Sequence, residues 1–381
     1  MSSPRAYCDW NATAPIRPEA AEAVTRALSL GNPSSIHTEG RAARAAIEQA
    51  RADVAALVGV EPGQVTFTSG GTEAAAAALQ PVADDEVLFI GAAEHACIRA
   101  GGRFAHDRRW VSPVDAEGRV DLAELELEVA RRGLVPGHVH VAIQIANNET
   151  GVINPPATFS RCREMGWTVT ADAVQALGKI PLGPYLESAD VLLVSAHKIG
   201  GPKGVGALVM RKDACGGVRP LLTGGGQERG MRAGTENVAG ITGFGAAARM
   251  ARQEADMSAV AALRDAFEVA LRELAPDVTV FGASAPRLPN TSLFSVPDLR
   301  AETALIAFDL DGVAVSSGSA CSSGKVARSH VLAAMGVPDG LAACAIRVSL
   351  GATSTRGDIA RCLSSLERQL GRLRTRRPSA A

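Results

Sequence analysis

The sequence is poor in several features that define large classes of protein. Only 4% of its 381 residues are aromatic, and 39 Lys and Arg nearly balance 40 Asp and Glu, for a formal net charge of −1. A balanced chain exerts no bulk attraction on nucleic acid or an anionic membrane. No apolar run reaches the roughly 20 residues that span a bilayer, and residues 1–20 lack the apolar centre of a secretory signal. We therefore expect a cytoplasmic protein without nucleic-acid or membrane partners.

Cysteine pairs at short spacing are absent as well. The seven cysteines are an odd number, and no Cys-x-x-C pair occurs, which argues against a zinc ribbon or a thioredoxin-like dithiol. His138 and His140 share a strand face, but no third ligand lies nearby in the sequence, so no resident metal site is expected. We expect free thiols in a reducing compartment. The cysteines are Cys8, Cys97, Cys162, Cys215, Cys321, Cys344 and Cys362.

Short Val- and Ile-rich runs alternate with helical patterns in the first two thirds of the chain. This alternation predicts an α/β domain built on a mostly parallel sheet flanked by helices. A helix is expected at Arg41–Val58, where apolar residues form one stripe. The expected strands are Val65–Phe67, Glu86–Ile90, His140–Ile145, Trp167–Thr170, Val191–Ser195 and Ala207–Met210.

The pattern changes after about Gly245 and predicts a smaller α+β domain. One long helix is expected over roughly Ala246–Leu274, and further helices at Glu302–Leu310, Val326–Met335 and near Asp358–Leu373. The domain boundary is expected near residue 250. The basic segment 372–381 is read as a solvated end, with a nucleic-acid arm as the alternative.

Two segments have the composition of ligand-binding turns. Residues 68–73 (Thr-Ser-Gly-Gly-Thr-Glu) follow a strand and open an Ala-rich helix, so Gly71 and Thr72 could bind an anion or simply cap the helix. Ser195-Ala-His-Lys198 ends another strand. A lysine there faces the crevice where α/β proteins bind ligands, and it can form a Schiff base if its pKa is lowered. An exposed lysine in a Gly-rich turn is the alternative.

Four more residues suit the chemistry of a site, and each has a structural alternative. Asp172 ends a strand and could face a pyridine nitrogen or cap the next helix. His95 could stack on a flat cofactor, act as an acid or base, or be structural. Arg347 lies between apolar neighbours and needs an anion, either a substrate carboxylate or an internal acid. Cys321 sits in a Ser/Gly-rich stretch, where an exposed thiol is better explained as a nucleophile than as a bystander.

Taken in order, these motifs resemble the class-V aminotransferases, which are fold-type I pyridoxal phosphate (PLP) enzymes, and within them the cysteine desulfurases of the NifS/IscS kind. The resemblance covers nearly the whole chain. It rests on residues 9–13, 31–37, 68–73, 94–95, 147–151, 172–175, 195–198, 232–236, 316–325, 329–332 and 346–349. It implies a large PLP-binding domain at 16–250 and a smaller domain formed by 1–15 and 251–381, with a mobile cysteine loop at about 316–328.

The resemblance also implies roles for individual residues. Lys198 would carry PLP, Asp172 would pair with its ring nitrogen, Gln175 with its phenolic oxygen, and His95 would stack on the ring and move protons. Cys321 would be the nucleophile that forms the persulfide, and as such a transient ligand of a nascent iron–sulfur cluster. The phosphate would be held by Gly71, Thr72, Ser195 and His197, and by Thr235 of the other subunit of a homodimer, whereas Asn147 would contact cofactor and substrate and Arg347 would bind the substrate carboxylate.

The implied function is a PLP-dependent sulfurtransferase. It would convert L-cysteine to L-alanine and pass the sulfur from Cys321 to an iron–sulfur scaffold or another acceptor protein. A selenocysteine lyase, another class-V lyase or an aminotransferase remains an alternative, and so does a non-catalytic binding relative. The chain departs from the family pattern at Trp10 and at 327–330, where no residue has a chemical role. The pathway that receives the sulfur is not indicated.

Overall fold

The large sheet carries the predicted α/β architecture. The computed structural model describes residues 5–212, 218–317 and 328–376. Within them lies a sheet of seven strands in the order β2-β8-β7-β6-β5-β3-β4. β8 runs antiparallel to both neighbours, and every other neighbouring pair is parallel, so the predicted fold class is confirmed. The strands are β2 (Val65–Thr68), β3 (Val87–Gly91), β4 (Arg109–Ser112), β5 (Val139–Gln144), β6 (Thr168–Asp172), β7 (Val191–Ser195) and β8 (Gly206–Met210).

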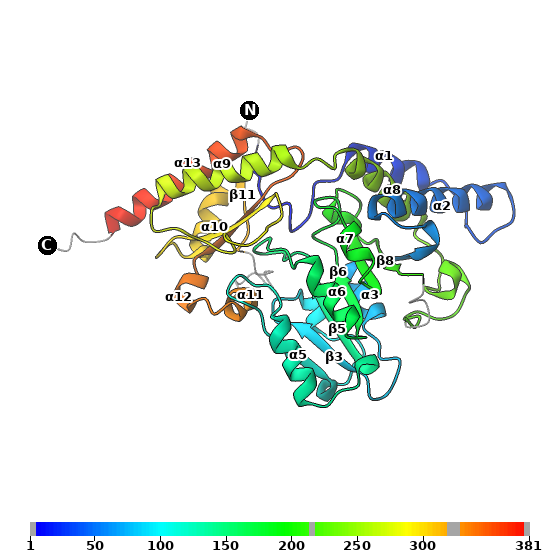
Figure 1. The fold of residues 1–381 in the computed structure, drawn as a ribbon. Helices are drawn as coiled ribbons and strands as arrows, with labels where there is room; N and C mark the ends of the chain where they lie inside the picture. The colour runs from blue at the N-terminus through cyan, green and yellow to red at the C-terminus, as the bar shows by residue number, and fades with distance from the viewer. Residues whose placement is uncertain (1–4, 213–217, 318–327, 377–381) are drawn as a thin grey trace.

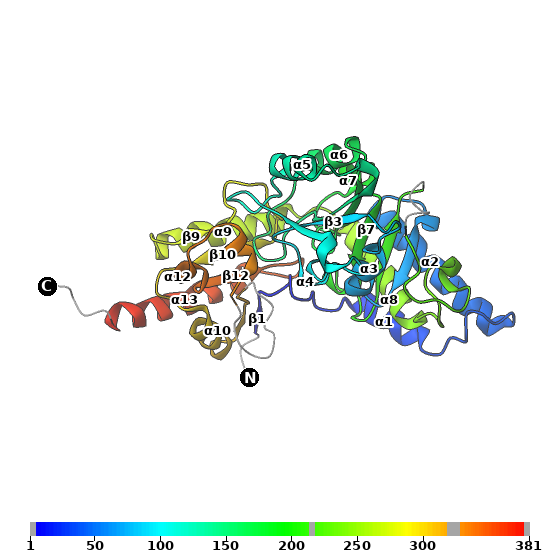
Figure 2. The ribbon, with the colours of Figure 1, turned by 90° about the horizontal axis from the view of Figure 1, so that it is seen from below.

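Helices cover both faces of this sheet because alternate strand residues point to opposite sides. Leu88, Ile90 and Leu193 pack with α3 (Gly71–Ala78) and α4 (Ala96–Arg99) on one face. Phe89 and Leu192, which alternate with them, belong to the larger core on the other face. Figure 2 shows the separation, with the helices α5, α6 and α7 on the far side of the sheet from α3. That core contains α2 (Thr38–Val58), α5 (Leu122–Arg131), α6 (Pro156–Glu164), α7 (Gly183–Leu186) and α8 (Val238–Gln253).

The long helix expected over 246–274 is wrong, because two helices share this stretch. α8 ends at Gln253, and α9 (Ser258–Leu274) starts after a break. The Asp256 carboxylate accepts a hydrogen bond from the Ser258 backbone N–H at 2.9 Å, which satisfies a free amide at the start of the second helix. Before the break, Gly245 lets α8 lie against α2, since a Cβ there would come within 2.5 Å of the Ala50 Cα. α8 therefore belongs to the large core.

A second, smaller core lies beside the large sheet. It contains residues from the beginning of the described chain as well as residues after 258, and it is called the smaller core below. It packs α9, α10 (Ala301–Leu310) and α13 (Arg356–Arg376) around an antiparallel sheet whose strands follow the order β12 (Ala345–Ser349), β10 (Thr291–Ser295) and β9 (Thr279–Val280). Figure 1 shows these elements grouped on the opposite side of the molecule from α1 (Pro18–Ala27), α2 and α8. The early strand β1 (Ala6–Tyr7) pairs in parallel with β11 (Val313–Ala314), so the first described residues belong to this core. The boundary near residue 250 stays a prediction.

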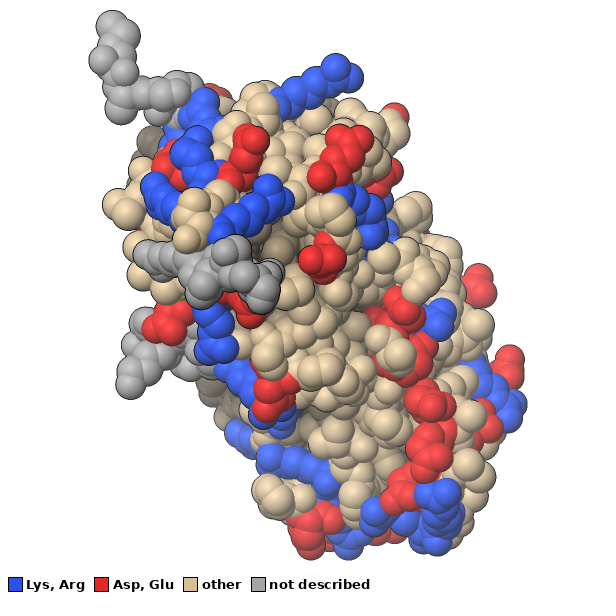
Figure 3. All heavy atoms as spheres, turned by 90° about the vertical axis from the view of Figure 1, so that its left-hand side faces the viewer, with Lys and Arg blue, Asp and Glu red and all other residues tan. Residues whose placement is uncertain are grey.

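Smaller elements complete the description. The helix predicted over Val326–Met335 is found as α11 (His330–Ala334), where the Ser329 hydroxyl caps the Leu332 N–H at 3.1 Å; residues 326 and 327 lie outside the described ranges. On the face shown in Figure 3, acidic and basic side chains are interspersed. No helix in the described ranges is long and apolar enough to cross a bilayer. The short helix α12 spans Asp339–Ala342.

Candidate active site

A cavity of about 490 Å³ lies where the carboxyl ends of the parallel strands meet the smaller core. β3, β5, β6 and β7 run in one direction, so their final residues share one edge, which is where open α/β sheets bind ligands. The structure brings most of the predicted site residues to this cavity. Those that line it are Gly71, Thr72, His95, Asp172, Gln175, Ser195, His197, Lys198 and Arg347.

Lys198 supplies a primary amine to the cavity. Its Nζ donates hydrogen bonds to the backbone carbonyls of Asn11 at 2.6 Å and Ala12 at 2.9 Å. Burial, followed by the nearby Arg347 cation, lowers the pKa of Lys198 to about 8, although Asp172 opposes the shift. An amine with this pKa is partly neutral near physiological pH, and a neutral amine is a nucleophile and a base.

Asp172 supplies a buried carboxyl at the end of the neighbouring strand. It is 7% exposed, and its Oδ1 accepts a hydrogen bond from the Val174 N–H at 2.8 Å. Burial raises the pKa of Asp172, while that backbone bond and the charges of His95 and Lys198 lower it. No side chain in the described residues forms a salt bridge with this carboxyl. A cationic ligand group would provide the missing partner.

His95 presents one ring nitrogen to the cavity and uses the other as a cap. Its Nδ1 accepts a hydrogen bond from the Cys97 N–H at 3.3 Å at the start of α4, and the Cys97 Sγ lies 3.0 Å from the same nitrogen. Burial raises the pKa of Cys97 to about 12, so this sulfur is a thiol that can donate. Although the ring lines the cavity, burial and the nearby Lys198 cation lower the pKa of His95, while the Asp172 charge opposes the shift. Nδ1 thus acts as the acceptor, and Nε2 carries the proton of a neutral ring.

The first turn of α3 forms a cradle at one end of the cavity. Gly70 has φ 149°, and no side chain caps the helix, so its first N–H groups lack a protein side-chain partner. A Cβ at Gly71 would lie 3.3 Å from the Val174 Cγ2, tighter than ordinary contact, so glycine keeps this turn close to the strand ends. Ser195 and His197 line the same cavity. Backbone N–H groups at a helix start beside a hydroxyl form an anion site.

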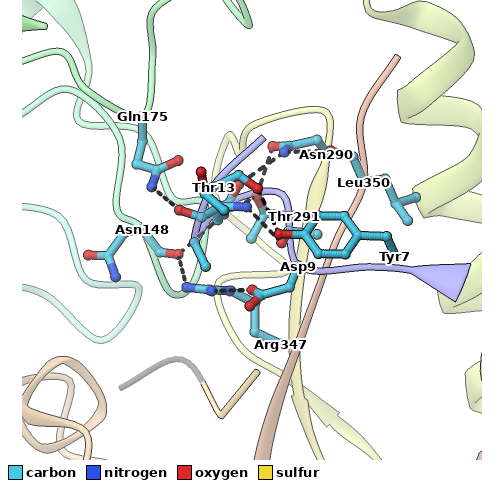
Figure 4. A network of polar contacts seen from close by, with 12 residues as sticks. Tyr7, Asp9, Thr13, Asn148, Gln175, Asn290, Thr291, Arg347 and Leu350 are labelled. Atoms are coloured by element: carbon cyan, nitrogen blue, oxygen red, sulfur yellow. Dashed lines mark hydrogen bonds and ion pairs between the residues drawn. The ribbon is translucent and has the colours of Figure 1, made fainter. Parts of the chain in front are cut away.

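Arg347 occupies the wall contributed by the smaller core. Its Nη2 pairs with the Asp9 carboxylate at 2.7 Å, and its Nη1 donates to the Asn148 carbonyl at 2.8 Å. The buried Nε has no hydrogen-bond partner among the described residues. Figure 4 shows Arg347 together with Asp9 and Asn148, so the internal acid considered as its partner is present, while the Arg347 side chain also lines the cavity in which a substrate carboxylate would lie.

Two predicted residues do not line the cavity. Asn147 is buried, and both ends of its amide bond within the protein: Nδ2 donates to the Ala93 carbonyl at 3.0 Å, and Oδ1 accepts from the Glu149 N–H at 2.8 Å. The next residue, Asn148, lines the cavity instead. Thr235 is exposed. Ligand contacts by Asn147 and Thr235 stay predictions, and Cys321 lies outside the described residues.

Thr235 follows a turn that is held firmly to the large core. Glu228 has φ 47° and Arg229 has φ 58°, a conformation that costs free energy for residues other than glycine. The buried Glu228 carboxylate pairs with both terminal nitrogens of Arg51 at 2.7 and 2.8 Å and accepts a bond from the Phe67 N–H at 2.8 Å. These contacts hold the strained turn in place and thereby fix the segment that carries Thr235.

Several residues of the cavity wall have no role predicted from the sequence, among them Asp9 and Asn11, which belong to a motif that supports the resemblance, and Cys97, which is expected to be a free thiol without a function. Lys179, outside the cavity lining, has no predicted role either, and it donates to Gln175 Oε1 at 2.7 Å. A lysine in a turn gives no sequence signal for burial, so only the structure identifies it.

Comparisons with known proteins agree with this arrangement. Residues 6–362 match the family described as aminotransferase class-V. The chain is 40% identical to the cysteine desulfurase IscS of Dictyoglomus turgidum, covering 98% of this chain and 96% of that protein. It is 40% identical to a cysteine desulfurase of Cereibacter sphaeroides, covering 99% and 98%. The structure of a NifS-like protein from Rickettsia africae superposes with a TM-score of 0.87 at 34% identity, covering 96% of this chain and 99% of that one.

Proposed function

The chain belongs to the class-V aminotransferase family, and on that premise we propose that it is a cysteine desulfurase that converts L-cysteine to L-alanine and retains the sulfur as a protein persulfide. One observation carries the proposal: the Lys198 amine, with its pKa lowered to about 8, and the buried carboxyl of Asp172 line one cavity at the ends of adjacent strands. A primary amine near neutrality and a buried acid are the two groups that amino-acid chemistry on PLP requires from a protein.

The family is one of PLP enzymes, and the residues of the cavity fit that cofactor. Asp172 is a buried carboxyl without a salt-bridge partner in the described chain, as a site for a protonated pyridine nitrogen needs to be. The uncapped first turn of α3, with no Cβ at Gly71, suits a phosphate. In this proposal Lys198 holds the aldehyde carbon, Gln175 faces the phenolic oxygen, and Thr72, Ser195 and His197 hold the phosphate. When bound, PLP supplies an electron sink that acidifies the Cα–H bond of an amino acid.

The chain's own residues then divide the remaining work. Arg347 lines the cavity, and we assign the substrate carboxylate to its guanidinium, which Asp9 and the Asn148 carbonyl hold in place. Lys198, once released, takes the Cα proton at Nζ, since its lowered pKa leaves a neutral amine available. His95 moves a proton at Nε2, because its Nδ1 is held by Cys97. The Asn11 and Ala12 carbonyls orient the Lys198 amine whenever it is free.

Sulfur transfer needs a thiol, which we assign to Cys321. The Cys321 sulfur attacks the substrate sulfur: a new S–S bond forms, the Cβ–S bond breaks, and its electron pair stays with the carbon, which takes up a proton to give alanine. The persulfide sulfur then passes to an acceptor protein such as an iron–sulfur scaffold. This assignment rests on the sequence resemblance, because Cys321 lies outside the described residues.

A homodimer is part of the proposal. Thr235 is exposed and does not reach the cavity of its own chain, although it sits on a segment held by the buried Arg51–Glu228 pair. An exposed residue on a rigid segment can serve the phosphate of a second subunit. Sedimentation of the purified protein at micromolar concentration tests this point directly.

The first experiment measures alanine and sulfide from L-cysteine, with PLP and a thiol reductant, in wild type and Cys321→Ala. Equal amounts of both products that vanish in the variant support the persulfide route. Cys97→Ala is the matched control, since Cys97 is the cysteine of the described chain that lines the cavity. Sulfide release that survives Cys321→Ala but not Cys97→Ala assigns the thiol to Cys97. Release that survives both indicates a lyase, and absence of both products in PLP-loaded wild type indicates another amino-acid substrate.

A further inference from the structure

Asn11 lines the cavity and forms the centre of a polar network, whose partners Asn148, Asn290 and Thr291 are labelled in Figure 4. It is 1% exposed, and its Nδ2 donates to the Asn148 carbonyl at 3.2 Å and to the Thr291 hydroxyl at 2.9 Å. Its Oδ1 accepts from the Asn290 Nδ2 at 3.0 Å. A backbone carbonyl can only accept, so the contact with Asn148 fixes which end of the Asn11 amide is the nitrogen.

Lys179 connects this network to Gln175. Its Nζ donates to Asn11 Oδ1 at 3.1 Å and to Gln175 Oε1 at 2.7 Å. Both partners are amide oxygens, and a lysine amine has at least two N–H donors in either protonation state, so it fills both acceptors. Burial, with Lys198 and Arg347 adding to it, holds the pKa of Lys179 well below its ordinary value. The charged form of Lys179 is therefore destabilised in the folded protein, and its two hydrogen bonds distinguish it from a solvated turn residue.

The amide of Gln175 is thereby held in one orientation. Gln175 is 5% exposed, with Oε1 toward Lys179 and Nε2 donating to the Asn11 carbonyl at 2.9 Å. Nε2 has a second N–H, and Gln175 lines the cavity. The Asn11 carbonyl, which can only accept, and the Lys179 amine, which donates, select the same orientation of this amide. Without Lys179, the buried Oε1 would lack its donor, and the Asn11 carbonyl alone would hold the amide. If the amide then turned, an oxygen facing the cavity would repel an anionic oxygen of a ligand, which the nitrogen would bind.

We propose that Lys179 is a positioning residue that orients the Gln175 amide, so that this wall of the cavity offers an N–H donor to the phenolic oxygen of the cofactor. The proposal rests on the proposed function only in taking PLP as the ligand. Lys179 does not line the cavity. It acts through Gln175. It also donates to Asn11, whose amide shares the Asn148 carbonyl with Arg347, so the same network connects Gln175 to Arg347.

The test titrates PLP into the apo-enzyme and records the dissociation constant and the pH midpoint of the visible absorption band, neither of which requires turnover. Lys179→Met removes both donors at similar length, and we expect it to weaken PLP binding about tenfold and to shift the absorption midpoint. Lys179→Arg keeps a donor-only group beside a small cavity of about 40 Å³ and should stay within about threefold of wild type.

A double-mutant cycle decides whether Lys179 acts through Gln175. Gln175→Leu alone should weaken binding about as much as Lys179→Met, and adding Lys179→Met to it should change the constant less than about twofold. Full additivity, or wild-type binding and spectrum in Lys179→Met, overturns the proposal. If Lys179→Met does not fold, Lys179→Gln replaces it, because its amide can face Gln175 with either end, and a loss of at least about threefold is then expected. Failure of wild type to bind PLP would instead overturn the proposed function.

Discussion

The two walls of the cavity are built on different principles. One wall, the reactive wall, consists of residues at the ends of parallel strands and at the start of α3, and it carries Lys198, Asp172 and His95. The other, the recognition wall, joins Asp9 to Arg347 and the Asn11 backbone to Ser349, each pair 338 residues apart in the sequence, and it carries the guanidinium to which we assign the substrate carboxylate. In the first wall the pKa values of Lys198, Asp172 and His95 are shifted mainly by burial. In the second wall, hydrogen bonds to the Asn148 carbonyl and the Asp9 carboxylate hold the Arg347 cation, and Asp9 already balances part of its charge. We infer that the first wall determines the rate of the chemistry and the second determines which ligands bind.

Replacing the amine of the reactive wall is expected to have the largest effect. Lys198→Ala removes the group to which the proposed function assigns the cofactor and the Cα proton, so we expect kcat for alanine formation to fall about 10³-fold or more. The measurement is alanine release from L-cysteine at saturating PLP. Lys203→Ala is the control, because Lys203 is exposed in the same turn and outside the cavity; it should stay within about twofold. A Lys198→Ala enzyme that keeps a tenth of its rate would contradict the division between the walls.

The recognition wall should respond in KM rather than in kcat. Arg347→Gln removes the charge and fork geometry that fit a carboxylate, and KM for L-cysteine should rise about 10- to 100-fold while kcat changes by only a few-fold. Thermal unfolding should be recorded alongside, since the variant leaves the Asp9 carboxylate unpaired. Arg356→Gln, at an exposed arginine that starts α13, is the control. A fall in kcat at unchanged KM would assign Arg347 to the reactive wall.

Beneath the reactive wall, a buried acid makes stability depend on pH. Glu94 is 1% exposed, its Oε1 accepts from the Gln144 N–H at 2.7 Å, and its Oε2 has no hydrogen-bond partner among the described residues. Burial, with the Asp172 charge, raises the pKa of Glu94 well above its ordinary value. The folded state therefore holds the proton more tightly than the unfolded state, and the free energy of unfolding falls as pH rises above about 4.5.

Glu94→Gln removes this ionisation, so urea denaturation between pH 5 and 7 should show a loss of stability in wild type that the variant lacks. We expect the difference to grow to the order of 1 kcal/mol at pH 7. The exposed Glu367→Gln is the matched control and should follow the wild-type profile. A parallel pH dependence of wild type and Glu94→Gln would show that Glu94 is ionised in the folded protein.

The smallest expected effect is a shift in the pKa of Lys198 when the Arg347 charge on the other wall is removed. Capture of PLP by the apo-enzyme needs a neutral Lys198 amine, so the rate of capture should rise with pH and level off above about 8. The Arg347 cation is one cause of that lowered pKa, and Arg347→Gln should move the midpoint to higher pH by less than about one unit. Stopped-flow absorbance measures both profiles. An unchanged midpoint would mean that burial alone sets the pKa of Lys198 and that the walls do not communicate.

The sequence predicts the reactive wall far better than the recognition wall, for a physical reason. Asp172, Ser195 and Lys198 end apolar runs that read as parallel strands, and the ends of parallel strands meet at one edge whatever the rest of the chain does. Burial is harder to predict. Lys179 has the local pattern of an exposed turn residue, and Asn11 acquires its role from Asn148, Asn290 and Thr291, which no local pattern connects to it.

Differences of detail have equally local causes. A single step along the chain separates Asn148, which lines the cavity, from Asn147, whose amide caps the following turn and whose ligand contact stays a prediction. The helix expected over 246–274 continues an apolar periodicity across a break that the Asp256 side chain stabilises by capping. Periodicity reports which face is buried and does not report where the backbone turns.

The parallel pairing of β1 with β11 sets an order of events during protein synthesis. Asp9 and Asn11 leave the ribosome more than 300 residues before their partners: β1 pairs with β11, the Asp9 side chain with Arg347, and the Asn11 backbone N–H with Ser349. The strands of the large sheet are synthesised long before then, and long-range closure is the slow class of folding step. A nascent chain paused before residue 345 therefore carries Lys198 and Asp172 without the Arg347 guanidinium. We expect the recognition wall to be the last part of the cavity to assemble.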